Sequence, residues 1–330
     1  MSRVFSMPRH GLTSGLLILG LVLIPMPLWA EDAAEAWLEQ MSKAMAGLNY
    51  EGELVYQHGD QIKVLQLIHT VRQGRERERL ISLNGVPREV IRDQDAVRCV
   101  RPSSQAVSVD RRGGSGYGFP SLQPLTAHEL GRVYRMRLAG QGGQARVAGR
   151  LARRLDIQPL DGYRYGHRLY LDEEYRLPLK QEVLDHQGQR VSLIMYSRIK
   201  VDPGLPFEAS QASPLSKDFS LIEYRPRQKV DGEQPEAWGL SRLPPGFHIS
   251  HRDFRQDEGG ISMEHLVLSD GLASVSLYLE PARPDNHFDG PSRLGAVSIH
   301  GRRLQDRQIL VIGEVPQVTT RFIAEAVELR

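Results

Sequence analysis

The chain has only one cysteine, Cys99, among its 330 residues. A single cysteine excludes an internal disulfide, so the fold must be stabilised by burial of apolar side chains. A chain of this length is ample for a large core and favours two domains over one. Cys99 lies in the apolar segment 96–100, which predicts a buried thiol, with a reactive thiol as the alternative.

A strong net charge is also missing. The sequence has 42 Lys and Arg against 40 Asp and Glu, a formal charge of +2. Two of the cations, Arg3 and Arg9, lie in an N-terminal segment that we expect to be removed, which leaves the mature chain formally neutral. The basic isoelectric point therefore gives no reason to expect binding to nucleic acid.

Long apolar runs are confined to the N-terminus. Arg3 and Arg9 precede the apolar segment 12–23, and a small residue, Ala30, ends a stretch that is broken by prolines. This order is typical of a secretory signal peptide over residues 1–30, cleaved after Ala30, and predicts a soluble periplasmic protein. The alternative is an uncleaved anchor. Glu31 follows the cleavage site where a bacterial lipoprotein would have cysteine, so no lipid anchor is expected there.

Complete catalytic motifs are absent. The glycine-rich segment 113–118 lacks the Lys-Ser/Thr pair of a phosphate-binding loop and has Tyr117 where a nucleophile elbow needs glycine. The acidic residues 172–174 fit a hairpin turn. His248 and His251 are three apart on a predicted strand and would point to opposite faces. We therefore predict no catalytic residues, no metal and no cofactor, although a hydrolase with an unrecognised site stays a third hypothesis.

The segment 34–71 organises the rest of the chain. Its first half has apolar residues at helical spacing up to Gly47, a plausible helix stop. The period then changes to 2, which predicts strand 50–56, a turn at 58–60 and strand 61–71. The second strand is apolar on both faces, which indicates a sheet with two covered faces or one face that lines a cavity.

Short strands and tight turns continue to residue 201 and predict an antiparallel meander in a first domain, 31–201. We place a short helix at 122–130. The expected strands are 79–83, 86–92, 96–101, 106–110, 134–138, 144–147, 152–159, 165–172, 177–185 and 190–201.

Residues 202–217 are rich in Pro, Gly, Ser and Ala without a hydrophobic period, which predicts a linker. A smaller α+β domain, 218–330, follows. Its expected strands are 246–255, 263–268, 273–279, 295–300 and 308–313, before a helix at 316–327. Residues 269–271 are expected to form a turn.

Several apolar residues of the first domain could line the inner side of a curved sheet and hold a lipid, although packing in the core is the default for each. These candidates are Tyr50, Leu54, Tyr56, Leu65, Leu67, Leu169, Leu171, Leu193 and Met195.

With these residues laid out, the chain resembles the RseB/MucB family of periplasmic regulators of sigma-E, and most closely its pseudomonad members. The most specific stretch is Ser269–Ser276, and the resemblance covers essentially the whole mature chain. The other matching stretches are Leu48–Gly52, Glu78–Leu80, Leu83–Gly85, Glu89–Val90, Leu243–Phe247 and Gly313–Pro316.

The resemblance implies an unclosed β-barrel with helices, similar to LolA and LolB, and a smaller domain that contacts the periplasmic part of a MucA/RseA-type anti-sigma factor. Binding would hide that factor from a site-1 protease and restrain the envelope stress (alginate) response. Lipid or lipopolysaccharide would cause release. No single contact residue carries over. As candidates for partner contacts we take residues of two matching stretches: Phe247, Ser269, Asp270, Gly271 and Ser274.

The runner-up hypothesis is a periplasmic carrier or chaperone for lipid or lipoprotein. A simple carrier needs only the barrel, whereas an added domain with its own linker favours a protein partner. The oligomeric state is open, and a homodimer is one of the alternatives.

Overall fold

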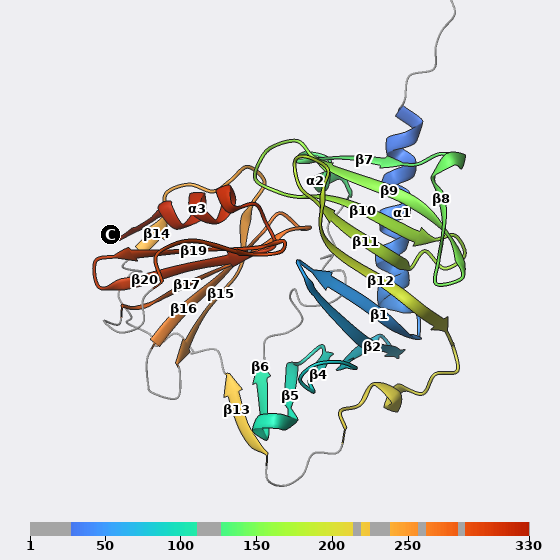
Figure 1. The fold of residues 1–330 in the computed structure, drawn as a ribbon, viewed down its shortest axis with the longest axis horizontal. Helices are drawn as coiled ribbons and strands as arrows, with labels where there is room; N and C mark the ends of the chain where they lie inside the picture. The colour runs from blue at the N-terminus through green and yellow to red at the C-terminus, as the bar shows by residue number, and fades with distance from the viewer. Residues whose placement is uncertain are drawn as a thin grey trace, which may run out of the picture.

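The computed structural model describes residues 28–110, 127–213, 219–224, 238–256, 262–282 and 288–329. Two domains lie side by side, each built on a β-sheet with a helix against it (Figure 1). Most of the predicted signal peptide, the glycine-rich segment 113–118 and the first part of the helix predicted at 122–130 lie outside the described residues. Of that helix, α2 (Ala127–Leu130) is described.

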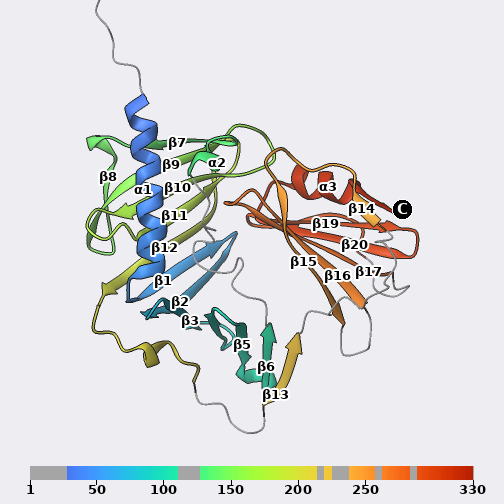
Figure 2. The ribbon, with the colours of Figure 1, turned by 180° about the vertical axis from the view of Figure 1, so that it is seen from behind.

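Helix α1 (Leu28–Gly47) lies against one face of the first sheet (Figures 1 and 2). It ends at Gly47, as predicted. Ala34, Leu38 and Met41 are spaced three or four residues apart, share one side of the helix and are buried. Among the described residues, none of the helices has the length and apolar composition that crossing a membrane requires.

The first sheet has 13 strands in the order β13-β6-β5-β4-β3-β2-β1-β12-β11-β10-β9-β7, with β8 also paired to β9. Its pairs are antiparallel except β13 with β6, and the path ends in two different strands, β13 and β7. The prediction of an unclosed sheet is therefore confirmed, whereas the specific likeness to LolA and LolB stays a prediction. The strands are β1 (Tyr50–His58), β2 (Gln61–Arg72), β3 (Arg75–Ser82), β4 (Glu89–Asp93), β5 (Val97–Arg101), β6 (Ala106–Asp110), β7 (Tyr134–Leu138), β8 (Gln144–Val147), β9 (Arg150–Pro159), β10 (Gly166–Asp172), β11 (Pro178–Leu184), β12 (Arg190–Val201) and β13 (Ser220–Tyr224).

Strand β3 begins four residues before the predicted strand 79–83 and takes in the charged stretch Arg75–Glu78. Two of these charges have partners of opposite sign: Arg75 pairs with Asp95 in the turn after β4, and Glu78 pairs with β4 itself. Glu78 is buried and accepts a hydrogen bond from Arg92 of β4 at 3.3 Å. A charged run that reads as solvent-exposed can thus be part of a sheet when the neighbouring strand supplies the opposite charge.

The predicted linker is packed across the first sheet over its described part, residues 202–213. The 3-10 turn η3 (Phe207–Ser210) contacts β2 and β3. The hydroxyls of Thr70 and Ser210 are 2.5 Å apart, and the Arg77 guanidinium lies 4.3 Å from the Phe207 ring centroid. This segment covers the face of β2 that is turned away from α1 near Thr70. Of the two alternatives for a strand that is apolar on both faces, the structure therefore shows two covered faces at this point.

The second domain has a six-stranded antiparallel sheet in the order β15-β16-β17-β20-β19-β18, with α3 packed on β19 and β20. A short pair, β14 with β21, completes it. The predicted helix 316–327 runs two residues past the end of α3 at Glu325, because Val327 pairs with Leu240 as a strand. The elements are β14 (Trp238–Leu240), β15 (His248–Gln256), β16 (Ser262–Ser269), β17 (Ser274–Pro281), β18 (Gly290–Leu294), β19 (Val297–Leu304), β20 (Arg307–Gly313), α3 (Gln317–Glu325) and β21 (Val327–Leu329).

Candidate functional site

The turn between β16 and β17 docks the second domain onto the first. The Asp270 carboxylate accepts hydrogen bonds from the backbone N–H groups of Leu272 at 3.0 Å and Ala273 at 2.7 Å, an Asx-type turn. Gly271 has a φ of +94°, which glycine adopts readily. The turn predicted at 269–271 is therefore confirmed. It presents Leu272, which packs into the apolar cluster that contains Leu38 and Met41 of α1.

A buried ion pair lies beside this turn. Arg164, from the loop between β9 and β10, is completely buried and donates from Nε to Oδ2 of Asp270 at 2.6 Å. Tyr134 of β7 donates to the same oxygen at 3.0 Å. The other guanidinium nitrogens of Arg164 donate to the Pro245 carbonyl, at 2.5 Å, and to Asp161. The charge is thus surrounded by acceptors from both domains, as a buried arginine requires.

Two further contacts join the domains, one at Gly246 between β14 and β15 and one at α3. Gly246 has a φ of +78°, and a Cβ there would lie 2.6 Å from Cγ1 of Val133 in the first domain. On the other side, the Thr319 hydroxyl of α3 donates to the Tyr163 carbonyl at 2.6 Å, and the Tyr163 and Phe322 rings meet edge to face. Close contacts of this kind leave the two domains little freedom to shift without breaking hydrogen bonds.

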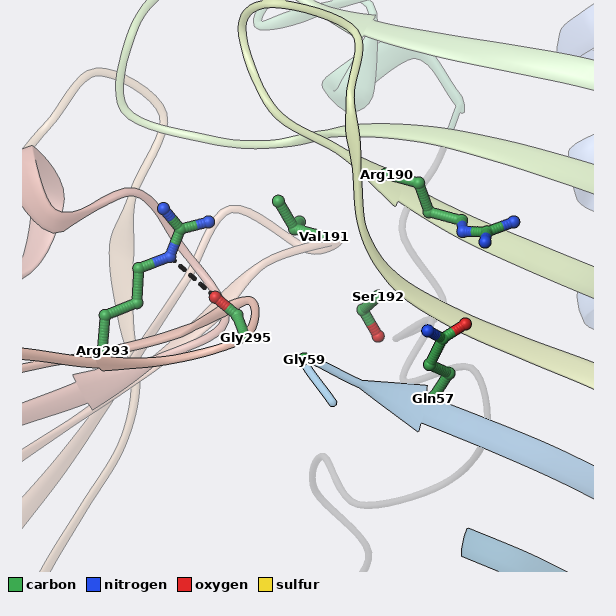
Figure 3. Close-up of a pocket in the computed structure, with 7 residues that line it drawn as sticks. All are labelled: Gln57, Gly59, Arg190, Val191, Ser192, Arg293 and Gly295. Atoms are coloured by element: carbon green, nitrogen blue, oxygen red, sulfur yellow. Dashed lines mark hydrogen bonds between the residues drawn. The ribbon is translucent and has the colours of Figure 1, made fainter. Parts of the chain in front are cut away.

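A polar hollow of about 390 Å³ lies between the end of β1, the start of β12 and the turn between β18 and β19 (Figure 3). Arg293 and Gly295 of the second domain face Ser192, Val191 and Gly59 of the first (Figure 3). Gln57 and Arg190 complete the lining.

His58 closes the junction at this hollow. A Cβ on Gly295 would lie 2.9 Å from the His58 ring. The ring is buried, and its Nδ1 lies 3.0 Å from the Tyr56 hydroxyl. Burial lowers the pKa of His58, opposed by a hydrogen bond to the Leu294 carbonyl. The ring is therefore neutral at pH 7. Protonation would place a positive charge next to Gly295 of the second domain.

The nine lipid candidates do not form one surface. Tyr56 bonds to His58 at the junction. Leu193 and Met195 alternate along β12 with Ile194 and Tyr196, which pack beneath α1, so they lie on the opposite face. The other six pack into two core clusters with side chains of α1: Tyr50, Leu54, Leu65, Leu67, Leu169 and Leu171. Lipid binding by any of the nine stays a prediction.

The partner candidates gather at the domain junction. Ser269, Asp270 and Gly271 are buried in the docking turn, and Phe247 is buried beside Arg164, whose guanidinium lies 5.1 Å from its ring centroid. Ser274 is half-buried and pairs with Ser269 across β16 and β17. Their role in binding a partner stays a prediction, while their role in joining the domains is visible in these contacts.

The sequence offered no sign of the residues that complete the junction, Arg164, Tyr134 and Thr319. Each stands in a segment that reads as an ordinary loop, strand or helix, and only the meeting of the domains brings them together. Among the described residues, no group of three or more His, Cys, Asp or Glu side chains is placed to hold a metal ion. Cys99 is buried, as its apolar surroundings predicted.

An open sheet against a helix, joined through a buried ion pair to a second sheet, defines a two-domain β protein with a polar hollow between the domains. The family model for the MucB/RseB N-terminal domain matches residues 33–216, and that for the MucB/RseB C-terminal domain matches residues 232–328. The chain therefore belongs to the MucB/RseB family, as the resemblance in its sequence indicated. The curated relatives it matches are sigma factor regulatory proteins, which are not enzymes.

The similarity runs over nearly the whole length of those relatives. The chain is 29% identical to the sigma factor AlgU regulatory protein MucB of Pseudomonas aeruginosa, over 94% of this chain and 96% of that protein. It is 25% identical to the sigma-E factor regulatory protein RseB of Haemophilus influenzae, over 95% and 97%. The crystal structure of MucB in complex with MucA(peri) is 26% identical and covers 90% of this chain and 99% of its own, with a TM-score of 0.67. The complex structure of Pseudomonas aeruginosa MucA/MucB has a TM-score of 0.69 at the same identity and coverage.

Proposed function

We propose that this chain is a periplasmic negative regulator of a sigma-E-type envelope stress (alginate) response. It binds the periplasmic domain of a MucA/RseA-type anti-sigma factor and shields that domain from site-1 proteolysis. Lipid or lipopolysaccharide releases it. The observation that carries the proposal is the match of both domains to a family whose member MucB has been solved with MucA. The signal peptide predicted over residues 1–30 supports a periplasmic location.

The buried junction supports a regulatory role for the pair of domains. Arg164 and Asp270 lie in different domains and share one completely buried contact. A ligand that shifts one domain must therefore disturb the other. A ligand can drive release only if it binds the released arrangement better than the shielding arrangement.

A binding titration tests the proposal. The chain from Glu31 onward is titrated with the periplasmic domain of a MucA-type anti-sigma factor, and the bound factor is then exposed to the site-1 protease. We expect saturable binding and slower cleavage. No binding would overturn the proposal, and lipid transfer between vesicles in its absence would favour the carrier.

Adding lipid to the same titration tests release. A tenfold weakening of partner binding corresponds to about 1.4 kcal/mol of coupling, and linkage requires that the partner weaken lipid binding by the same factor. Equal partner affinity with and without saturating lipid would leave a passive shield and remove the sensing role.

A further inference from the structure

A second hollow, of about 540 Å³, lies on the face of the first sheet that turns away from α1. Its lining includes Arg135 and Arg137 of β7, Arg154 of β9 and Arg168 of β10, here called the basic groove. Tyr134 and Met136 alternate with the first two arginines and are buried in the cluster that contains α1 residues. Successive side chains of a strand point to opposite faces, so Arg135 and Arg137 project away from the helix.

The charges of this groove are out of balance. Arg154 and Arg168 both donate to one carboxylate, Asp156, at 3.0 Å each, and Arg168 also donates to Glu182, outside the lining of the hollow, at 3.3 Å. Arg135 and Arg137 are exposed and have no hydrogen-bond or ion-pair partner within the described ranges. A further carboxylate at the rim, Asp185, accepts the backbone N–H groups of Gln187 and Gln189 in its own turn. Four guanidinium groups thus line a hollow that holds two carboxylates.

Strand register brings these arginines to one place. Arg137 is paired with Asp156, which is paired in turn with Arg168 on the next strand. Neighbouring strands are about 4.8 Å apart, and residues two apart on a strand are separated by about 7 Å. Because Asp156 lies between Arg137 and Arg168 in this register, the space open to a small polyoxygen anion is the one bordered by Arg135 and Arg137 on β7, beside Gln158, the register partner of Arg135.

We propose that the basic groove binds a phosphate-bearing ligand, the phosphorylated headgroup of a lipid. Arginine presents a planar fork of N–H donors that matches phosphate oxygens, and several guanidinium groups can share one phosphate. The assignment to lipid rests on the proposed function, in which lipid is the releasing signal; the phosphate chemistry rests on the groove alone. Headgroup recognition on this face would also leave the packed side chains beneath α1 undisturbed.

The test uses the chain from Glu31 onward and vesicles of phosphatidylcholine, whose phosphate diester is neutralised by choline, with or without phosphatidic acid, whose phosphate monoester is anionic and accessible. The variant is Arg135→Gln with Arg137→Gln, whose side chains have no hydrogen-bond or ion-pair partner to lose in the part of the chain that the structure describes. The control is Arg132→Gln with Arg146→Gln, which removes the same charge from two exposed arginines outside the groove. Circular dichroism checks that both variants fold.

We expect the wild type and the control to bind the phosphatidic acid vesicles at least about tenfold more tightly than the variant, since two charge-assisted contacts are removed. Equal losses in variant and control, or equal binding to both vesicles by the wild type, would overturn the proposal. Inorganic phosphate that binds with the same arginine dependence while the vesicles do not would overturn the lipid assignment in favour of a free anion. If a glutamate-rich peptide binds in a way that depends on Arg135 and Arg137, while the vesicles and inorganic phosphate do not, the lipid assignment would be overturned in favour of an acidic peptide.

The same variant separates this inference from the proposed function. The Arg135→Gln, Arg137→Gln protein should bind the anti-sigma domain with wild-type affinity but resist release by phosphatidic acid vesicles. Loss of anti-sigma binding in the wild type would overturn the proposed function, whatever the vesicles show. Normal release of the variant by these vesicles would overturn the role of the groove while leaving the proposed function intact.

Discussion

Arg164 of the first domain and Asp270 of the second form an ion pair with 2.6 Å between Nε and Oδ2, and both side chains are completely excluded from solvent. Removing one partner of such a pair leaves the other charge buried without compensation, which is more costly than the pair itself is stabilising. The contact therefore makes the stability of each domain depend on the other.

Replacing Asp270 with alanine should lower the free energy of unfolding by about 3 kcal/mol or more, because Arg164 would keep its charge in the interior. The measurement is urea denaturation followed by fluorescence of Trp37 in the first domain and Trp238 in the second. Both signals should move to lower urea. The control is Glu208→Ala, whose partner Arg72 is mostly exposed, and it should cost less than about 1 kcal/mol. Equal losses for the two variants would contradict the importance of the buried pair.

Gly246→Ala should destabilise the protein more than Gly85→Ala. Both glycines have positive φ, +78° and +71°, so backbone strain is similar. Only Gly246 faces another domain, where its new Cβ would meet Val133 at 2.6 Å, whereas Gly85 has open space. We expect the difference in unfolding free energy to exceed about 1 kcal/mol, in line with overpacking. Equal decreases in the thermal unfolding temperature of the two variants would show that Val133 moves aside with no loss of stability and that the contact is not tight in solution.

His69 should make the protein less stable as the pH falls. The ring is buried, stacks on Tyr50 and lies 2.8 Å from the Leu48 carbonyl, and burial lowers its pKa to about 4. The unfolded chain, with a pKa near 6.5, binds the proton more readily, so this contribution is complete above pH about 6.5 and is lost towards pH 4. The loss amounts to about 3 kcal/mol.

The variant for this test is His69→Phe, which keeps a ring against Tyr50 and cannot titrate. Its unfolding free energy, measured from pH 7.5 to 4.5, should fall less steeply than that of the wild type. Parallel curves for His69→Phe and the wild type would show that this ring does not control the acid sensitivity.

Leu67→Ala should cost about 2–5 kcal/mol, the usual range for a completely buried leucine. Ile62 lies on the same strand but is 58% exposed, and Ile62→Ala should cost less than about 1 kcal/mol. Chemical denaturation of the two variants provides the comparison. A folded Leu67→Ala protein of wild-type stability would show that Leu67 lines an open space, as the lipid-cavity hypothesis requires.

Local patterns in the sequence were enough to predict much of the fold. The helix that ends at Gly47, the hairpin at Gly59 and the alternating strands up to Val201 follow from hydrophobic period and turn residues, which act over a few neighbours. The strands β6, β7, β8 and β12 have their predicted bounds. Family membership could also be predicted from the sequence, because short stretches such as Ser269–Ser276 resemble the family and need no tertiary structure to be recognised.

Only the tertiary structure decided which of these residues meet. Asp270 reads as a polar turn residue, yet it is buried because Arg164, 106 positions earlier, supplies the opposite charge. Ile194 packs beneath α1 while Met195 lies on the other face, a choice set by strand register and by the helix that covers one side. The basic groove likewise exists because register places Arg137 beside Asp156 and Arg168. Sequence determines local geometry through nearby interactions, whereas burial and charge pairing depend on contacts between residues that are distant along the chain.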